Sequence, residues 1–140
     1  MTHYAKTENG FLLHHVSVIV SDTERSLAFY RDILGFQLTE RPDLGFPGAW
    51  LSVEGGQQIH LMELDNPDPT TGRPAHGGRD RHMAFTVADI APVRALLDEK
   101  NIPYTLSKSG RRALFCRDPD GNAIEIIERG CEARLGIGFA

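Results

Sequence analysis

The sequence predicts an α+β protein made of two tandem modules, each with the order strand, helix, strand, strand, strand. A strand-like run from His15 to Asp22 recurs as the run from His82 to Asp89, at an offset of 67 residues. Each run precedes a segment with apolar residues at helical spacing, and three strand-like runs follow each of these segments. With 140 residues, the chain has the length of a single domain, residues 1–140.

The first module is expected over about residues 12–66. Its helix is predicted at residues 23–34, with a capping box of Ser21 and Glu24 at the start and Gly35 as the stop. The apolar residues at helical spacing are Leu27, Tyr30, Ile33 and Leu34. After its opening strand, further strands are predicted at residues 36–40, 49–53 and 58–64.

The second module is expected over about residues 81–129. Its helix is predicted at residues 90–100, with Pro92 in the first turn and Asn101 as a left-handed stop. The strands after that helix are predicted at residues 104–107, 113–117 and 123–128. Residues 65–80, with three prolines and three glycines, are expected to form a linker or a loop over a site, and the tail 130–140 is left unassigned.

The composition is that of a soluble globular protein and excludes several classes. Apolar residues make up 41% and charged residues 24% of the chain. No apolar stretch reaches the length of a membrane span, and Met1–Gly10 lacks the apolar core of a signal peptide. The net charge of −4 does not indicate a nucleic-acid partner. Cys116 and Cys131 lack metal-like spacing, which fits a reducing cytoplasm, so we expect a cytoplasmic protein without membrane or nucleic-acid partners.

The alternation of side chains along the strands separates two faces. Val16, Val18 and Val20 suit packing against a helix, and His15 then faces the opposite, helix-free side. The second module repeats this arrangement, with His82 on the helix-free side. In the last strand of each module, the same alternation allows the remaining candidates to face that side. These are His60 and Glu125.

Imidazole and carboxylate groups are ligands of zinc, nickel, iron and manganese, and two histidines with one carboxylate form a facial triad with open positions. The candidate metal ligands are His15, His60, His82 and Glu125. A lone strand histidine is usually an ordinary hydrogen-bonded residue. Two histidines at repeat-equivalent positions with a Glu on the same face make that reading weaker, so a divalent metal site is a serious alternative.

Arginines near the predicted cup could bind an anionic substrate, or they could be solvated surface charges. Arg117 shares a face with Phe115, so an inward face would make Phe115 a substrate wall and Arg117 an anion clamp. The reverse parity would place Cys116 inward. Trp50 could line the pocket or belong to the core. The remaining arginines in this region are Arg73, Arg79, Arg81, Arg111 and Arg112, of which Arg73 and Arg79 are expected inward only if the linker folds over the cup.

Two motifs together resemble the vicinal oxygen chelate superfamily, which includes glyoxalase I, fosfomycin-modifying thiol transferases, extradiol dioxygenases and bleomycin-binding proteins. They are the run SLAFYRDILGF at residues 26–36 and the run DPDG at residues 118–121 with the following Glu125. The resemblance covers about residues 12–129. It implies an open, cup-shaped mixed sheet formed by two βαβββ modules around a metal ion, with ligands at the positions of His15, His82 and Glu125.

The resemblance implies a metal-dependent glyoxalase-like lyase that chelates vicinal oxygens of a small anionic substrate or thiol adduct, with Glu125 as the catalytic, proton-transferring residue. His60 stands where glyoxalase I usually has a second glutamate ligand. A metal-bound imidazole nitrogen cannot take up a proton, and alternation places Glu63 on the helix face, so a second base is missing. A dioxygenase, which the short chain disfavours, a fosfomycin-type thiol transferase and a bleomycin-resistance-like binding protein remain alternatives. Relatives are usually homodimers, and some build each cup from modules of two chains.

Overall fold

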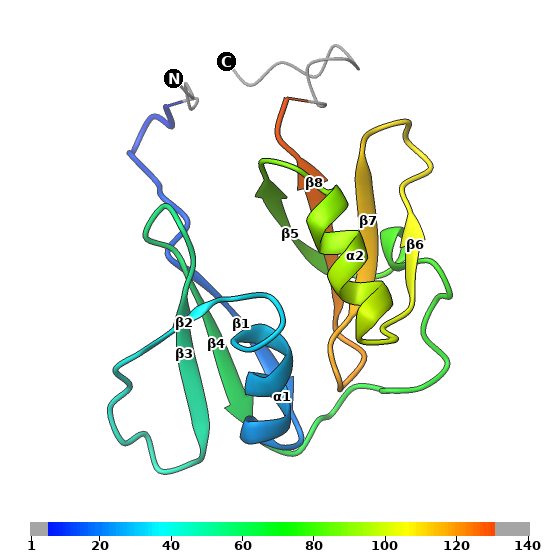
Figure 1. Ribbon diagram of the computed structural model, residues 1–140. Coiled ribbons are helices and arrows are strands. Elements are labelled where there is room, and N and C mark those ends of the chain that lie inside the picture. Colours follow the sequence, from blue (N-terminus) through cyan, green and yellow to red (C-terminus); the bar gives the residue numbers. More distant parts are fainter. Residues whose placement is uncertain (1–5, 131–140) are drawn as a thin grey trace.

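A computed structural model describes residues 6–130 of the chain (Figure 1). The elements of the first module are β1 (His15–Val20), α1 (Thr23–Tyr30), β2 (Gln37–Thr39), β3 (Gly48–Ser52) and β4 (Gln58–Glu63). The short helix η1 (Gly77–Arg79) belongs to the linker. The elements of the second module are β5 (His82–Val87), α2 (Ala91–Glu99), β6 (Tyr104–Leu106), β7 (Ala113–Arg117) and β8 (Ala123–Glu128).

Each module folds into its own four-stranded mixed sheet. The strand orders are β1-β4-β3-β2 and β5-β8-β7-β6, and in both sheets the first strand runs parallel to the last. The remaining neighbours are antiparallel. The sheets are open, with β1 and β5 each on an edge. The predicted βαβββ repeat is therefore confirmed in both halves.

The predicted elements match the observed ones except around α1. The helix ends at Tyr30 because the backbone N–H groups of Leu34 and Phe36 bond to carbonyl oxygens five and six residues earlier, at 2.9 and 3.0 Å. Gly35 completes this wider turn with a positive φ of 81°. The predicted capping box is wrong: Asp22 is the N-cap, and its carboxylate accepts from the backbone N–H of Arg25 at 3.1 Å.

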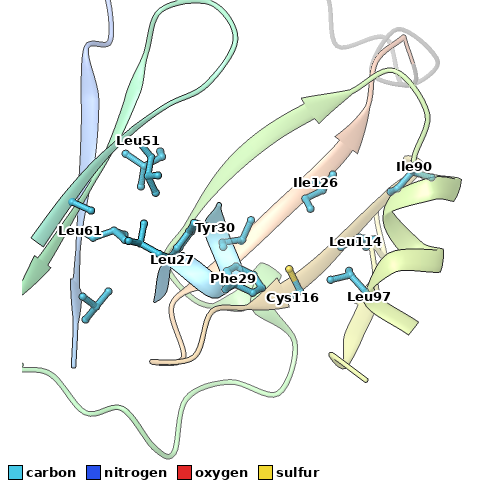
Figure 2. Packing of buried hydrophobic residues seen from close by; sticks show 14 residues of the cluster. Leu27, Phe29, Tyr30, Leu51, Leu61, Ile90, Leu97, Leu114, Cys116 and Ile126 are labelled. Carbon is cyan, nitrogen blue, oxygen red and sulfur yellow. The ribbon is translucent and has the colours of Figure 1, made fainter. Parts of the chain in front are cut away.

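The helix-bearing faces of both sheets share one hydrophobic core (Figure 2). Leu61 of β4 and Leu27 of α1 lie at one end of this core, and Leu114 of β7 packs against Leu97 of α2 at the other. Tyr30 lies between these ends and is fully buried. Because the core joins the helix-bearing faces, the helix-free faces of the two sheets do not close over each other within one chain.

A polar seam joins the turn before β8 to the end of β1 and to both ends of α1. The Tyr30 hydroxyl donates to Asp118 at 2.6 Å, and the Asn122 amide donates to the Ile19 carbonyl at 3.2 Å. The carboxylate of Asp120 accepts from the backbone of Ser21 at 3.1 Å. Burial raises the pKa of both Tyr30 and Asp118. The two sequence motifs that indicated the superfamily therefore bind each other and join the modules.

The linker folds back over the helix-free face of the second sheet. Helix η1 lies against β7 and β8. A Cβ atom added at Gly77 would lie 3.0 Å from the Cβ atom of Phe115, so a larger residue there would have to displace Phe115. Among residues 6–130, no helix has the length and apolar character needed to cross a membrane.

Candidate metal centre

The strand register places the four candidate ligands on the helix-free faces, in two pairs. His60 is level with Ser17 of β1 and with Trp50 of β3, so it shares a face with His15. Glu125 is level with Ala84 of β5, so it shares a face with His82. The alternation of side chains along the predicted strands places these four residues on the same faces. Each module therefore presents one pair of candidate ligands.

In the second module, the two atoms that could bind a metal ion lie close together. The Nε2 atom of His82 is 3.2 Å from Oε2 of Glu125, and its Nδ1 atom is 2.8 Å from the carbonyl oxygen of Asp80. The carbonyl can only accept, so Nδ1 carries the proton. Nε2 then faces a carboxylate oxygen, and this contact is favourable only with a second proton or a cation between the two atoms.

The separation fits a shared cation. Two ligands at ~2.1 Å from one ion lie about 3.2 Å apart when the angle at the ion is about 100°, between octahedral and tetrahedral values. A carbonyl that fixes the distal nitrogen of a ligand histidine is also a common support of metal sites. Glu125 is 4% exposed. The Arg111 guanidinium donates to its Oε1 atom at 2.8 Å, and a cation at Oε2 would bind the other carboxylate oxygen.

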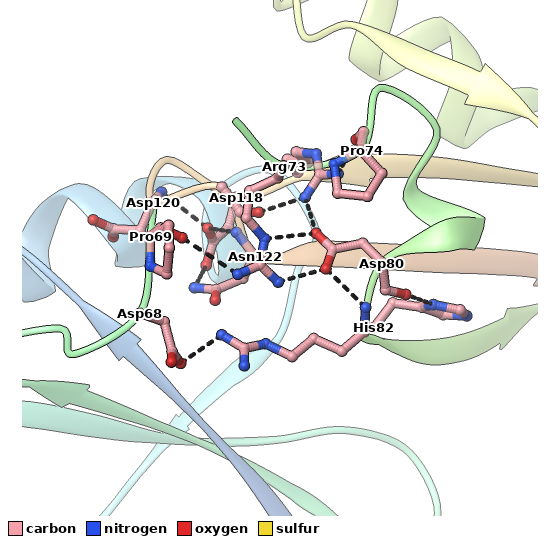
Figure 3. Close-up of polar contacts among 12 residues, drawn as sticks. Asp68, Pro69, Arg73, Pro74, Asp80, His82, Asp118, Asp120 and Asn122 are labelled. Carbon is pink, nitrogen blue, oxygen red and sulfur yellow. Dashed lines mark hydrogen bonds and ion pairs between the residues drawn. The ribbon is translucent and has the colours of Figure 1, made fainter. Parts of the chain in front are cut away.

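Asp80 is itself held by three groups (Figure 3). Its carboxylate accepts from the guanidinium of Arg73, from Nη1 of Arg117 at 2.8 Å and from the backbone N–H of Arg81 at 2.8 Å. These bonds, that of Arg73 above all, hold the pKa of Asp80 well below its usual range. The side chain of Asp80 thus fixes the residue whose carbonyl orients His82.

The structure corrects part of the expected substrate site. Arg117 also donates to the carbonyl oxygens of Gly121, at 2.7 Å, and Pro74, so its guanidinium binds the linker and is not a free anion clamp. Phe115 shares the face of Glu125, the first of the two parities considered, but it is 6% exposed beneath η1 and meets the His82 ring edge-on at 5.2 Å. It supports the imidazole and is not an open wall. Arg79 is exposed on η1.

In the first module, three aromatic rings form a stack. The rings of His15 and His60 lie 4.0 Å apart at 17°, and Trp50 lies on the other side of His60 at 4.2 Å and 7°. Trp50 therefore belongs to the helix-free face. Burial lowers the pKa of His60, and the neighbouring His15 adds to this. Both effects favour the neutral imidazole, the form that binds metals.

The two pairs do not meet within one chain. Across residues 6–130, no three His, Cys, Asp or Glu side chains come close enough together to hold one metal ion. A cleft of about 380 Å³ lies between β1 and β5, and His82 is the one candidate ligand on its wall. The other lining residues include Ser17, Met62, Arg73, Arg81 and Asn122.

Several contacts of the site were not predicted from the sequence. Arg111 donates through Nη2 to Oε1 of Glu125 at 2.8 Å. Extending the alternation of residues 113–117 backwards by two positions places Arg111 on the same face as Phe115, so the signal was present. His14 is not one of the four candidate ligands, and its Nδ1 atom lies 2.9 Å from Nδ1 of His15. His76, a residue of the linker, packs on Phe115 and bonds to Thr105 at 2.7 Å.

Two residues are excluded from the site by their positions. Cys116 is buried in the core, where burial raises the pKa of its thiol to about 12, so the reverse parity does not occur. Glu63 lies on the helix side as predicted, and its Oε1 atom accepts from the backbone N–H of Thr23 at 2.8 Å. It caps α1 and is not available as a second base.

The chain belongs to the Glyoxalase/Bleomycin resistance protein/Dioxygenase superfamily, whose family model matches residues 12–126. Glyoxylase I 4 of Arabidopsis thaliana is 36% identical over 120 residues, which cover 81% of this chain and 68% of that protein. A glyoxalase family protein from Bacillus anthracis has a similar structure, with a TM-score of 0.68 and 25% identity over 91% of this chain and 98% of that one.

A variant of the fosfomycin resistance protein FosX from Listeria monocytogenes, solved in complex with Mn(II), shares the fold at a TM-score of 0.68 and 19% identity. The match covers 89% of this chain and 96% of that one. Mn(II) is thus bound in a solved protein of this fold.

Proposed function

We propose that this protein is a metal-dependent, glyoxalase-like enzyme whose cation is held in part by His82 and Glu125. The observation that carries the proposal is the pair itself. Nε2 of His82 and Oε2 of Glu125 are 3.2 Å apart, while the Asp80 carbonyl occupies the other imidazole nitrogen. A cation between the two atoms satisfies both of them.

We further propose that a second copy of the chain completes the site with His15 and His60. Within one chain the two pairs remain apart, and the helix-free side of the edge strands is open, with His15 and His82 exposed. Three apolar residues just before β1 are also exposed: Phe11 at 77%, Leu12 at 92% and Leu13 at 66%. A twofold dimer would cover these surfaces and form two equivalent sites.

In this arrangement, a bound zinc, nickel, iron or manganese ion would polarise two vicinal oxygens of the substrate. Glu125 would move a proton at the adjacent carbon, because it is the one carboxylate among the four candidate ligands. His60 is held as a neutral imidazole against Trp50 and supplies no second carboxylate. With one base in place of two, Glu125 would both remove the proton and return it at the neighbouring carbon.

Elemental analysis of protein purified without an affinity tag tests the metal. We expect a stoichiometric transition metal, either as purified or after incubation with nickel, zinc, manganese and ferrous iron. Protein that takes up none of these ions under any condition would remove the basis for the metal-dependent reaction. Trp50, the single tryptophan of the chain, provides a second readout, because metal binding at the adjacent His60 should change its fluorescence.

Mixing two defective variants tests the shared site. His15→Ala and Glu125→Gln each damage every site of a homodimer. In a mixed dimer with sites built across the two chains, one site contains both substitutions and the other contains neither. We expect the mixture to regain metal binding and turnover of a thiol hemithioacetal. If each site came from one chain, mixing would restore nothing.

A further inference from the structure

We propose that Arg111 is the anion-recognising residue of the site and selects substrates that carry a carboxylate beside a second oxygen. This inference rests on the proposed metal site and extends it to the class of substrate. It starts from the two oxygens of Glu125. Oε2 faces His82 at 3.2 Å, and Oε1 accepts from Nη2 of Arg111 at 2.8 Å.

The position of Arg111 suits contact with a ligand. Its side chain is 24% exposed, whereas that of Glu125 is 5% exposed, so the guanidinium is the part of this ion pair that a ligand can reach. It lies two residues before β7 on the helix-free face, in a turn that contains Gly110 with a φ of 86°. Apart from Glu125, the guanidinium is held by the Ser109 hydroxyl, which accepts from Nε at 3.1 Å.

A cation bound through Oε2 changes the charge balance around Glu125. One carboxylate then faces both a divalent cation and a guanidinium, while the histidine ligands are neutral. The excess positive charge is only partly exposed to water. In such a partly buried site, opposite charges attract more strongly than in bulk solvent. The site in this state favours an anionic ligand over a neutral one.

The guanidinium geometry defines the kind of anion. Arginine presents several N–H donors in one plane and binds carboxylates better than a single ammonium group does. A 2-hydroxycarboxylate offers its hydroxyl and one carboxylate oxygen to a metal and retains a second carboxylate oxygen for Arg111. Substrates or products of this type fit the pair of a cation and Arg111.

The arginines that follow do not combine partial exposure with a bond to Glu125. Arg117 and Arg73 are bound to Asp80, and Arg81 pairs with Asp68 at 2.6 Å. Arg112 points to the other side of the strand, where its Nε donates to Glu128 at 2.6 Å. Arg112 is therefore a matched control: it is the neighbour of Arg111 in the sequence and is paired with a glutamate that is not a candidate ligand.

The test uses the full-length protein loaded with Co²⁺, whose visible absorption reports both metal uptake and ligand binding. The probes are glycolate and its neutral isostere glycolamide. For Arg111→Ala, we expect Co²⁺ to bind roughly tenfold more tightly, because a competing charged hydrogen bond to Glu125 is lost, and glycolate to bind roughly tenfold more weakly. Glycolamide binding should not change. Arg111→Lys should bind glycolate with intermediate affinity, and Arg112→Ala should behave as the wild type in all titrations.

The opposite signs of the two effects separate recognition from misfolding, since a damaged fold weakens both. Unchanged glycolate affinity in Arg111→Ala would overturn the assignment, as would weaker Co²⁺ binding, which would make Arg111 a support of Glu125 only. If the wild type and Arg112→Ala take up no Co²⁺, the proposed metal site itself is wrong and this assignment falls with it. If both take up Co²⁺ and only the effects of Arg111→Ala are missing, the metal site stands.

Discussion

The two modules share a scaffold but differ in their polar groups. In each, the first strand runs parallel to the last, and a glutamate at the end of that last strand accepts from a backbone N–H at the start of the helix. Glu63 does so for Thr23 at 2.8 Å, and Glu128 does so for Ile90 at 3.3 Å. The candidate ligands differ, because the first module has two stacked imidazoles and the second has an imidazole and a buried carboxylate.

The supports of the two pairs differ as well. His82 is oriented by a carbonyl whose residue is fixed by two arginines, and Glu125 is bonded to Arg111. His60 is held mainly by Trp50 and by the amide of Gln58, at 2.9 Å from Nε2. The repeated scaffold is therefore compatible with unequal roles: the second module supplies the ionic and proton-transferring groups, and the first supplies neutral ligands.

Replacing the carboxylate of the second module should have the largest effect on activity. We expect Glu125→Gln to lower turnover by a factor on the order of 10³, because the proton-transferring group and a charged ligand are lost together. Turnover of a thiol hemithioacetal by metal-saturated protein measures this. His76→Ala, which changes a linker residue over the same sheet, is the control and should remain active. Equal turnover in the two variants would remove the catalytic role of Glu125.

The difference between the pairs predicts unequal losses of metal affinity. His82→Ala should weaken binding roughly 100-fold, because it removes the imidazole whose free nitrogen is fixed toward Glu125. His60→Ala should weaken it only about tenfold, since it removes a neutral imidazole and leaves the pair of His82 and Glu125 intact. Competition with a coloured chelator measures both constants. A larger loss in His60→Ala would reverse the proposed order of the modules.

Most of the scaffold could be predicted from the sequence because it depends on local periodicity. The offset between His15 and His82 gave the repeat, and alternation along the strands gave the faces of His60 and Glu125. The shortened α1 could not be predicted, because Ile33 and Leu34 keep a helical apolar spacing with Tyr30, while the backbone N–H groups of Leu34 and Phe36 form wider turns.

The detailed contacts of the site could be predicted less well from the sequence, since they join residues that are distant along the chain. Arg117 shares a face with Phe115, as alternation allows, but its engagement depends on where the linker places Asp80 and Pro74. The alternation of side chains within one strand cannot predict where a separate loop places its hydrogen-bonding groups. The separation of the two ligand pairs within one chain likewise depends on how the modules pack, which the common core of α1 and both sheets decides.

The seam between the modules gives a stability prediction. Tyr30→Phe should lower the free energy of unfolding by about 1–3 kcal/mol, because buried Asp118 loses a donor. Burial already raises the pKa of Asp118 above its unfolded value, so ionisation of this group lowers stability as the pH rises through that range. The Tyr30 hydroxyl offsets this, and its removal raises that pKa further.

Urea unfolding should therefore show a larger difference between Tyr30→Phe and wild type near pH 7 than near pH 4. Tyr104→Phe is the matched control, because the hydroxyl of Tyr104 has only a 3.4 Å contact with Nε of Arg94, and it should change stability by less than about 0.5 kcal/mol. A loss in Tyr30→Phe that is the same at both pH values would mean that the Tyr30 hydroxyl does not lower the pKa of Asp118 in the folded protein.

A modest effect should come from loosening the residue that orients His82. Asp80→Asn keeps the backbone carbonyl but weakens the bonds that hold it, since the amide has one acceptor oxygen for two arginines and an N–H. We expect metal affinity to fall about tenfold while the fold is kept. Asp68→Asn is the matched control, because Asp68 and its partner Arg81 are 44% and 65% exposed, and it should leave metal affinity unchanged.

The ¹⁵N shifts of the His82 imidazole in metal-free protein test whether Asp80 acts by orienting His82. The wild type should have its proton fixed on Nδ1, and Asp80→Asn should show a mixture of both tautomers. A fixed Nδ1 proton in the variant together with weaker metal binding would mean that Asp80 acts through charge and not by orienting His82.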